Sequence, residues 1–163
     1  MKASAAIEKV INIHEMEDCL EKAIKEITTT MFDCNSEIIP FECVDLIPPG
    51  LSAIVGFGGK ISGNISIHLS PENACALASN MLGMEIKEMD DIVADAMGEM
   101  VNMLAGGMKK YACTREDLFK ISVPSIIYGA DYSTHSPKDS ERLLMGIKTG
   151  PSTYSIQLIF IHS

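Results

Sequence analysis

Residues 90–111 read DDIVADAMGEMVNMLAGGMKKY and predict one long helix with two different faces. One face is an apolar stripe typical of a buried helix side, made of Val93, Met97, Met100, Leu104 and Met108. The opposite face carries Asp95, Glu99, Asn102 and Gly106. Because residues three or four apart are neighbours on a helix, the Glu99 carboxylate and the Asn102 carboxamide should project side by side. Such a pair can bind a cation and orient a water molecule, so it is the candidate site.

Small and apolar residues border this polar strip: Ile92, Ala96 and Met103 on one side, and Ala94, Gly98 and Ala105 on the other. A solvated helix face would be expected to carry Lys, Glu and Gln there. The border therefore favours a docking surface for another protein, with Gly98, Met103 and Gly106 as contacts beside the site. The alternative is that the protein's own neighbours bury these flanks and that Gly106 and Gly107 end the helix.

Composition limits the class of protein. The 163 residues, 47% hydrophobic and 21% charged, fit one folded domain covering residues 1–163. A formal net charge of −9 argues against nucleic acid and anionic membranes as partners, since phosphates would be repelled. No apolar run approaches the ~20 residues of a membrane span, and the N-terminal segment lacks the apolar core of a signal peptide. We expect a soluble, cytoplasmic protein.

Cysteine and histidine spacing predicts no metal site. The five cysteines never occur as C-x-x-C and are interpreted as small hydrophobic residues: Cys19, Cys34, Cys43, Cys75 and Cys113. The four histidines are scattered, and none has another His or a Cys three or four residues away. The glycine-rich stretch 56–62 does not match a phosphate-binding loop, because Ile54 and Ile61 occupy the places that need Gly and Ser or Thr.

The remaining pattern predicts an α+β domain in which long helices pack on an antiparallel sheet, in the order α-βββ-αα-βββ. Helices are expected over 14–32 and from Ser70 to Gly83, with an irregular last turn in the first because of its three threonines. Strands are expected over 37–47, over a hairpin at 51–69, and over 118–123, 125–128, 141–148 and 154–162. The outline suggests a weak internal duplication in which Glu26 and Thr29 stand where Glu99 and Asn102 stand.

The pattern Asp95-x-x-x-Glu99-x-x-Asn102, followed by Pro124, resembles the signature of the bacterial chemotaxis phosphatases CheC, CheX and FliY. The hairpin and the last two strands also fit that family's layout. CheC-like members carry two Glu-x-x-Asn sites, whereas this chain has one, since Glu26 is followed by Thr29 instead of Asn. The chain is therefore most similar to CheX-like members.

This resemblance implies a phosphatase that hydrolyses the aspartyl phosphate of a CheY-type response regulator. Asn102 would orient the attacking water, and Glu99 would dock on the regulator's lysine. The regulator would supply the divalent metal, Mg, so no cofactor of the chain's own is expected. A homodimer formed through strands is also implied. Asp95 could contact the partner or pair with a Lys or Arg elsewhere.

Two other functions remain open. The strip could belong to a non-catalytic module that binds a receiver domain or another signalling protein. It could also be only a solvated face of a structural dimer.

Overall fold

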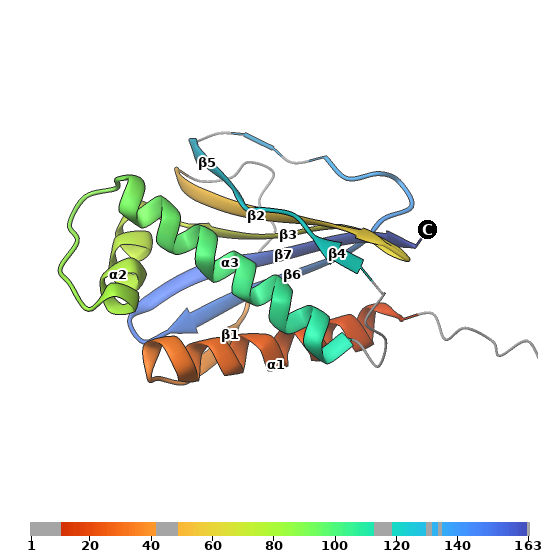
Figure 1. Cartoon of the computed structure of the whole chain (residues 1–163), viewed down its shortest axis with the longest axis horizontal. Coiled ribbons are helices and arrows are strands. Elements are labelled where there is room, and N and C mark those ends of the chain that lie inside the picture. Colours follow the sequence, from red (N-terminus) through yellow and green to blue (C-terminus); the bar gives the residue numbers. More distant parts are fainter. Residues whose placement is uncertain (1–10, 42–48, 113–118, 130–131, 134, 163) are drawn as a thin grey trace, which may run out of the picture.

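A computed structural model describes residues 11–41, 49–112, 119–129, 132, 133 and 135–162. These residues form three helices and seven strands (Figure 1). The helices are α1 (Ile13–Phe32), α2 (Pro71–Leu82) and α3 (Asp91–Ala112). The strands are β1 (Ser36–Ile39), β2 (Gly50–Gly59), β3 (Ile61–Leu69), β4 (Phe119–Ile121), β5 (Ser125–Gly129), β6 (Glu141–Thr149) and β7 (Ser152–His162).

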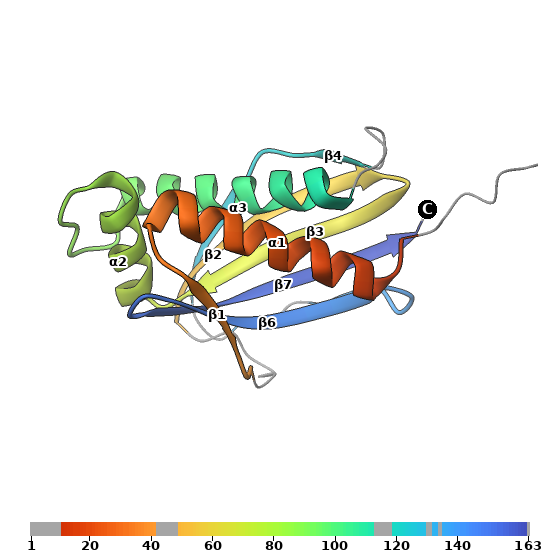
Figure 2. The same ribbon diagram turned by 90° about the horizontal axis from the view of Figure 1, so that it is seen from below.

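All strands join one antiparallel sheet in the order β1-β6-β7-β3-β2-β4, and β5 also pairs with β2. The hairpins β2–β3 and β6–β7 meet in the middle, where Ile65 lies opposite Leu158. Helices α1 and α3 lie side by side and run in opposite directions over one face of the sheet (Figures 1 and 2). The predicted α+β fold with an antiparallel sheet is therefore confirmed.

Alternating strand residues build the core under these helices. In β3, Ile61, Ile65, Ile67 and Leu69 are at most 1% exposed, and the residues between them are half-buried. This is the period-two pattern of a strand with one face on the core. Strand β7 repeats the pattern with Ile156, Leu158 and Phe160. The core fixes α3 against the sheet, because the apolar stripe of α3 packs on these side chains.

Capping residues set where the helices begin and end. Ser70 accepts a hydrogen bond from the Asn73 amide at the start of α2, and Gly83 ends that helix in the left-handed conformation, as the sequence predicts. At α3, the Asp90 carboxylate accepts a hydrogen bond from the Val93 amide over 3.0 Å. This cap fixes the N-terminal end of the helix that carries the candidate site.

Two local predictions are wrong. The last turn of α1 is regular, because the Thr28 hydroxyl donates to the Ile24 carbonyl over 2.9 Å, and the Thr30 hydroxyl donates to the Glu26 backbone carbonyl over 2.7 Å. These bonds satisfy the hydroxyls within the helix. The strand expected over 37–47 ends at Ile39, before Pro40, and the later part of that range lies outside the described residues.

The sheet has an approximate internal symmetry. Exchanging β1 with β4, β2 with β6 and β3 with β7 gives the same strand order, read from the other end of the sheet. The two long helices, α1 and α3, exchange in the same operation. The topology is thus consistent with the duplication suggested by the sequence, and it makes α1 the counterpart of the helix with the candidate site.

Candidate active site on helix α3

Helix α3 presents the two faces that its sequence predicts. Val93, Met97, Met100, Leu104 and Met108 are at most 1% exposed and form its buried stripe. On the opposite face Asp95, Glu99 and Gly106 are exposed and Asn102 is half-buried. Glu99 and Asn102 are three residues apart in a continuous helix, so their side chains leave the same face one turn apart.

Neither Glu99 nor Asn102 is engaged through its polar group by another described residue. Within the described part of the chain, neither side chain has a hydrogen bond or ion pair with another residue. A carboxylate and a carboxamide held on a rigid helix, and open to an approaching molecule, can accept a cation and align a water. The arrangement therefore leaves both groups available to a partner.

The flanks of the strip are mostly buried by the protein itself. Ala94, Ala96, Gly98 and Ala105 are buried, Met103 is half-buried, and Ile92 is 46% exposed. The composition of the flanks is therefore explained chiefly by internal packing, and the surface open to a partner is narrower than the sequence suggested.

Gly98 lies against β5 and the residue just before it. A Cβ atom at Gly98 would stand 3.5 Å from Pro124 Cγ and 3.5 Å from Ile126 Cδ1. Gly98 was expected on the partner-facing surface, but its contacts in this structure are to its own chain. The corner that holds Pro124 therefore packs on the helix at the residue before Glu99.

Gly106 and Gly107 do not end the helix, because α3 continues to Ala112. They have different surroundings. A Cβ at Gly106 would meet no atom within 4 Å, whereas one at Gly107 would lie 2.9 Å from the Ala23 Cβ of α1. Gly107 therefore permits the close crossing of α1 and α3, and Gly106 faces outward in line with the candidate site.

The N-terminal half of α3 is acidic and lies beside a tyrosine of β5. The Tyr128 hydroxyl donates to the Asp90 carbonyl over 3.3 Å. Partial burial, followed by the charges of Asp91, Asp90 and Asp95, raises the pKa of Tyr128. Tyr128 therefore lies at the N-terminal end of α3, on the side of the strip that β5 borders.

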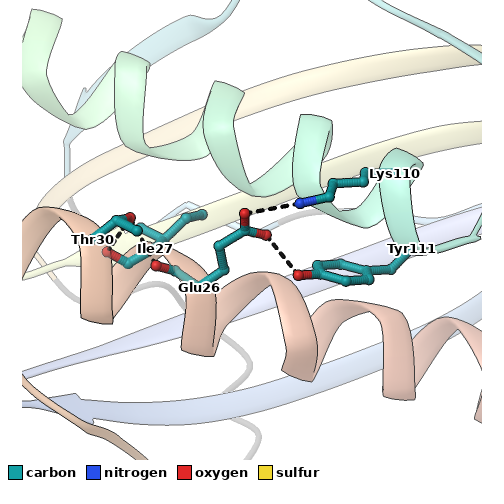
Figure 3. A network of polar contacts seen from close by, with 5 residues as sticks. All are labelled: Glu26, Ile27, Thr30, Lys110 and Tyr111. Atoms are coloured by element: carbon teal, nitrogen blue, oxygen red, sulfur yellow. Dashed lines mark hydrogen bonds and ion pairs between the residues drawn. The ribbon is translucent and has the colours of Figure 1, made fainter.

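The position on α1 that the suggested duplication pairs with Glu99 is engaged by internal contacts (Figure 3). Glu26 Oε1 lies 2.9 Å from Lys110 Nζ, and the Tyr111 hydroxyl donates to Glu26 Oε2 over 2.8 Å. These two contacts, the lysine first, lower the pKa of the Glu26 carboxyl. Thr29 is exposed and carries a hydroxyl where α3 has the Asn102 amide. Unlike Glu99, Glu26 is therefore committed to the fold.

Among the described residues, no three His, Cys, Asp or Glu side chains gather in a way that could hold a metal ion. In the same residues, no helix has the length and hydropathy needed to span a membrane. Cys19 and Cys75 are buried and Cys34 is half-buried, while Cys43 and Cys113 lie outside the described residues.

The sequence analysis placed Val123 at the end of the strand expected over 118–123 and did not identify it as an exposed residue. This residue precedes Pro124 at the corner between β4 and β5, and its side chain is 83% exposed. Within the sequence it looks like part of an apolar strand, and the only signal against burial was the proline after it.

Comparisons with known proteins agree with this fold and identify a family. The family model of the chemotaxis phosphatase CheX matches residues 51–148, which include all of α3. The CheY-P phosphatase CheX of Thermotoga maritima is 35% identical in an alignment of length 94, which covers 55% of this chain and 59% of that protein. The aligned part thus spans little more than half of that curated relative.

Solved structures share the fold over nearly the whole chain. A CheC-like superfamily protein from Shewanella has a TM-score of 0.79 at 20% identity, covering 93% of this chain and 99% of its own. The CheX-CheY-BeF3-Mg²⁺ complex from Borrelia burgdorferi has a TM-score of 0.72 at 22% identity, covering 95% and 100%. The family model covers more than half of the residues, and the resemblance seen in the sequence is thereby confirmed. The chain belongs to the CheX family of chemotaxis phosphatases.

Proposed function

We propose that this protein hydrolyses the aspartyl phosphate of a CheY-type response regulator, with Glu99 and Asn102 as its active site. The observation that carries the proposal is the pair itself. Two neighbouring polar side chains on a rigid helix face outward, without internal partners among the described residues, in a chain of the CheX family. Both the curated relative, named a CheY-P phosphatase, and the solved complex of CheX with CheY support the choice of substrate.

The chemistry asks little of the enzyme. An aspartyl phosphate is a mixed anhydride, and water attack at phosphorus breaks the P–O bond and releases the aspartate carboxylate and inorganic phosphate. No covalent enzyme intermediate is needed, so catalysis can rest on positioning and electrostatics. In this mechanism the Asn102 carboxamide holds the attacking water in line with the breaking bond. Glu99 pairs with a lysine of the regulator and fixes the docked orientation.

The proposal assigns the divalent metal to the regulator. The chain's described residues offer no cluster of metal ligands, and the Borrelia complex contains Mg²⁺ together with CheY. The strip around the pair would contact the regulator through Asp95, Met103 and Gly106, with Gly98 placing the neighbouring corner. We also propose that the protein acts in the cytoplasm and that it forms a homodimer. Light scattering of the purified protein would test the dimer.

The test is the decay of a phosphorylated CheY-type regulator with and without the protein. Wild type should accelerate the decay, and Asn102→Ala should lower kcat by about 100-fold, with binding largely retained, because a misplaced water costs about that much. Glu99→Ala should also weaken binding. Thr29→Ala, an exposed residue at the matching place on α1, should leave the rate unchanged. Full activity of Asn102→Ala would reject this assignment.

If the protein binds the regulator without accelerating decay, the non-catalytic binding module is the correct reading. That alternative uses the same exposed pair for docking alone. Measuring binding and decay on the same samples therefore separates the two functions.

A further inference from the structure

The corner between β4 and β5, residues 122–124, carries the most exposed large hydrophobic side chain among the described residues. Val123 is 83% exposed, whereas the others in that class, Tyr128 and Met84 among them, do not exceed 51%. Isolated hydrophobic residues on a surface are common and need no special explanation. The case for Val123 therefore depends on how it is held and on what lies beside it.

Hydrogen bonds on its N-terminal side hold the corner firmly. The Ser122 amide donates to the Gly56 carbonyl over 2.8 Å, and the Gly56 amide donates to Ser122 Oγ over 3.0 Å. The same hydroxyl donates to the Val123 carbonyl over 3.1 Å. Because β4 and β5 both pair with β2, the sheet fixes the chain before and after the corner. Val123 is thus exposed on a well-fixed backbone.

Packing on its C-terminal side places the corner beside the candidate active site. Pro124 lies on Gly98, the residue that directly precedes Glu99 in α3. A half-exposed aromatic side chain, Tyr128 of β5, lies further along this border, where its hydroxyl donates to the Asp90 carbonyl. The corner and β5 therefore border the polar strip on the Gly98 side, and Val123 directly precedes the proline that contacts Gly98.

We propose that Val123 is an apolar anchor covered by the phosphorylated regulator when it docks, and that it contributes to the choice of regulator. The inference rests on the proposed function. The occupant it requires is a receiver domain with an apolar patch next to its phosphorylated aspartate. Because the backbone is held by hydrogen bonds and a valine side chain has few rotamers, little conformational freedom is lost on binding, so burial of Val123 adds to affinity at a small entropic cost. Val123 touches no reacting atom in this account, and its effect should fall on binding.

The test compares Val123→Ser with Ile38→Ser. Ile38 is 46% exposed on β1, at the opposite end of the sheet from β4, and serves as the matched control. The probe is the CheY-type regulator of the same genome, phosphorylated with acetyl phosphate. Val123→Ser should raise KM about tenfold, the loss expected when a buried valine contact is removed, with kcat within about twofold of wild type. Ile38→Ser should leave both parameters unchanged, and all variants should keep the wild-type Tm within about 2 °C.

An unchanged KM for Val123→Ser, or a fall in kcat with KM unchanged, overturns the proposal while the proposed function stands. A change in oligomeric mass for Val123→Ser, seen by light scattering, also overturns it, because the corner would then contact a second copy. If wild type does not accelerate decay, the proposed function fails, and calorimetric titration with the regulator then decides on Val123. Weaker binding by Val123→Ser than by wild type supports the anchor. Equal binding by the two proteins, or no binding by wild type, rejects it.

Discussion

Replacing each of the adjacent glycines in α3 by alanine should have opposite effects on stability. At Gly106 the new methyl would meet no atom within 4 Å. Alanine is favoured over glycine inside a helix by ~0.5–1 kcal/mol, so Gly106→Ala should stabilise the protein by about that amount. For a domain of this size 1 kcal/mol corresponds to ~2–4 °C in Tm. We therefore expect Tm to rise by about 1–4 °C.

At Gly107 the methyl would lie 2.9 Å from the Ala23 Cβ and 3.4 Å from the Ala23 Cα. Carbon atoms in good contact are about 3.5–4.0 Å apart, and an alanine methyl cannot rotate away, so α1 and α3 must separate. Overpacking of this kind costs ~1–3 kcal/mol, which exceeds or cancels the helix-propensity gain of up to ~1 kcal/mol. Gly107→Ala should therefore lower the free energy of unfolding by up to ~2 kcal/mol.

Urea unfolding followed by circular dichroism gives both free energies. The double variant Ala23→Gly with Gly107→Ala moves the methyl from one helix to the other, and it should recover part of the loss relative to the two single variants. This recovery is a coupling energy between the two positions. Equal stability of Gly106→Ala and Gly107→Ala, or no coupling between positions 23 and 107, would refute the close-crossing explanation. Gly106→Ala also tests whether Gly106 contacts the regulator. If it does, the added methyl should hinder docking and slow dephosphorylation of the regulator, although the protein itself is more stable.

Three further predictions follow from other contacts. Asp90→Ala removes the α3 cap and should cost ~1 kcal/mol, measured by urea unfolding, and an unchanged midpoint would show that the cap contributes nothing. Burial raises the pKa of Tyr154 to about 12, so one tyrosine should resist ionisation in absorbance titration until about that pH, and stability should fall between the unfolded value near 10 and 12. Lys110→Ala should raise the lowered pKa of Glu26, measured by NMR titration. The variant should also lose less stability than wild type as the pH falls through the folded-state pKa of Glu26. An unchanged pKa would contradict the pairing.

Much of the fold could be predicted because local signals and burial agree. The 3.6-residue period of α3, the alternation in β3 and the cap residues of α2 each depend on short stretches of sequence, and the structure confirms all three. The pairing of β1 with β6 and of β4 and β5 with β2 joins residues far apart in the chain, as in Ile38 opposite Ile147. No local pattern specifies such partners, so the sheet order required the structure.

The candidate site shows the same division. Helical spacing alone places Glu99 beside Asn102, and the structure has both on the outward face. The same reasoning misjudged the flanks, because the composition of Ala94, Gly98 and Ala105 does not reveal whether β5 or a partner covers them. In the structure Gly98 is covered by Pro124. Small residues mark close approach of some backbone, and only the tertiary arrangement shows whose backbone it is.

Differences between the two helices related by the internal symmetry explain why only one of them should dock a regulator. Exchanging the halves of the sheet brings α1 to the place of α3, and Glu26 is then the counterpart proposed for Glu99. Glu26 already has a lysine, Lys110, at 2.9 Å, which is the kind of contact that we propose a regulator's lysine makes with Glu99. Thr29, in the place of Asn102, has no amide with which to hold a water as proposed for that residue. Both differences act in the same direction, since α1 has its carboxylate engaged and its water-orienting group replaced, and a single working face per chain is therefore expected.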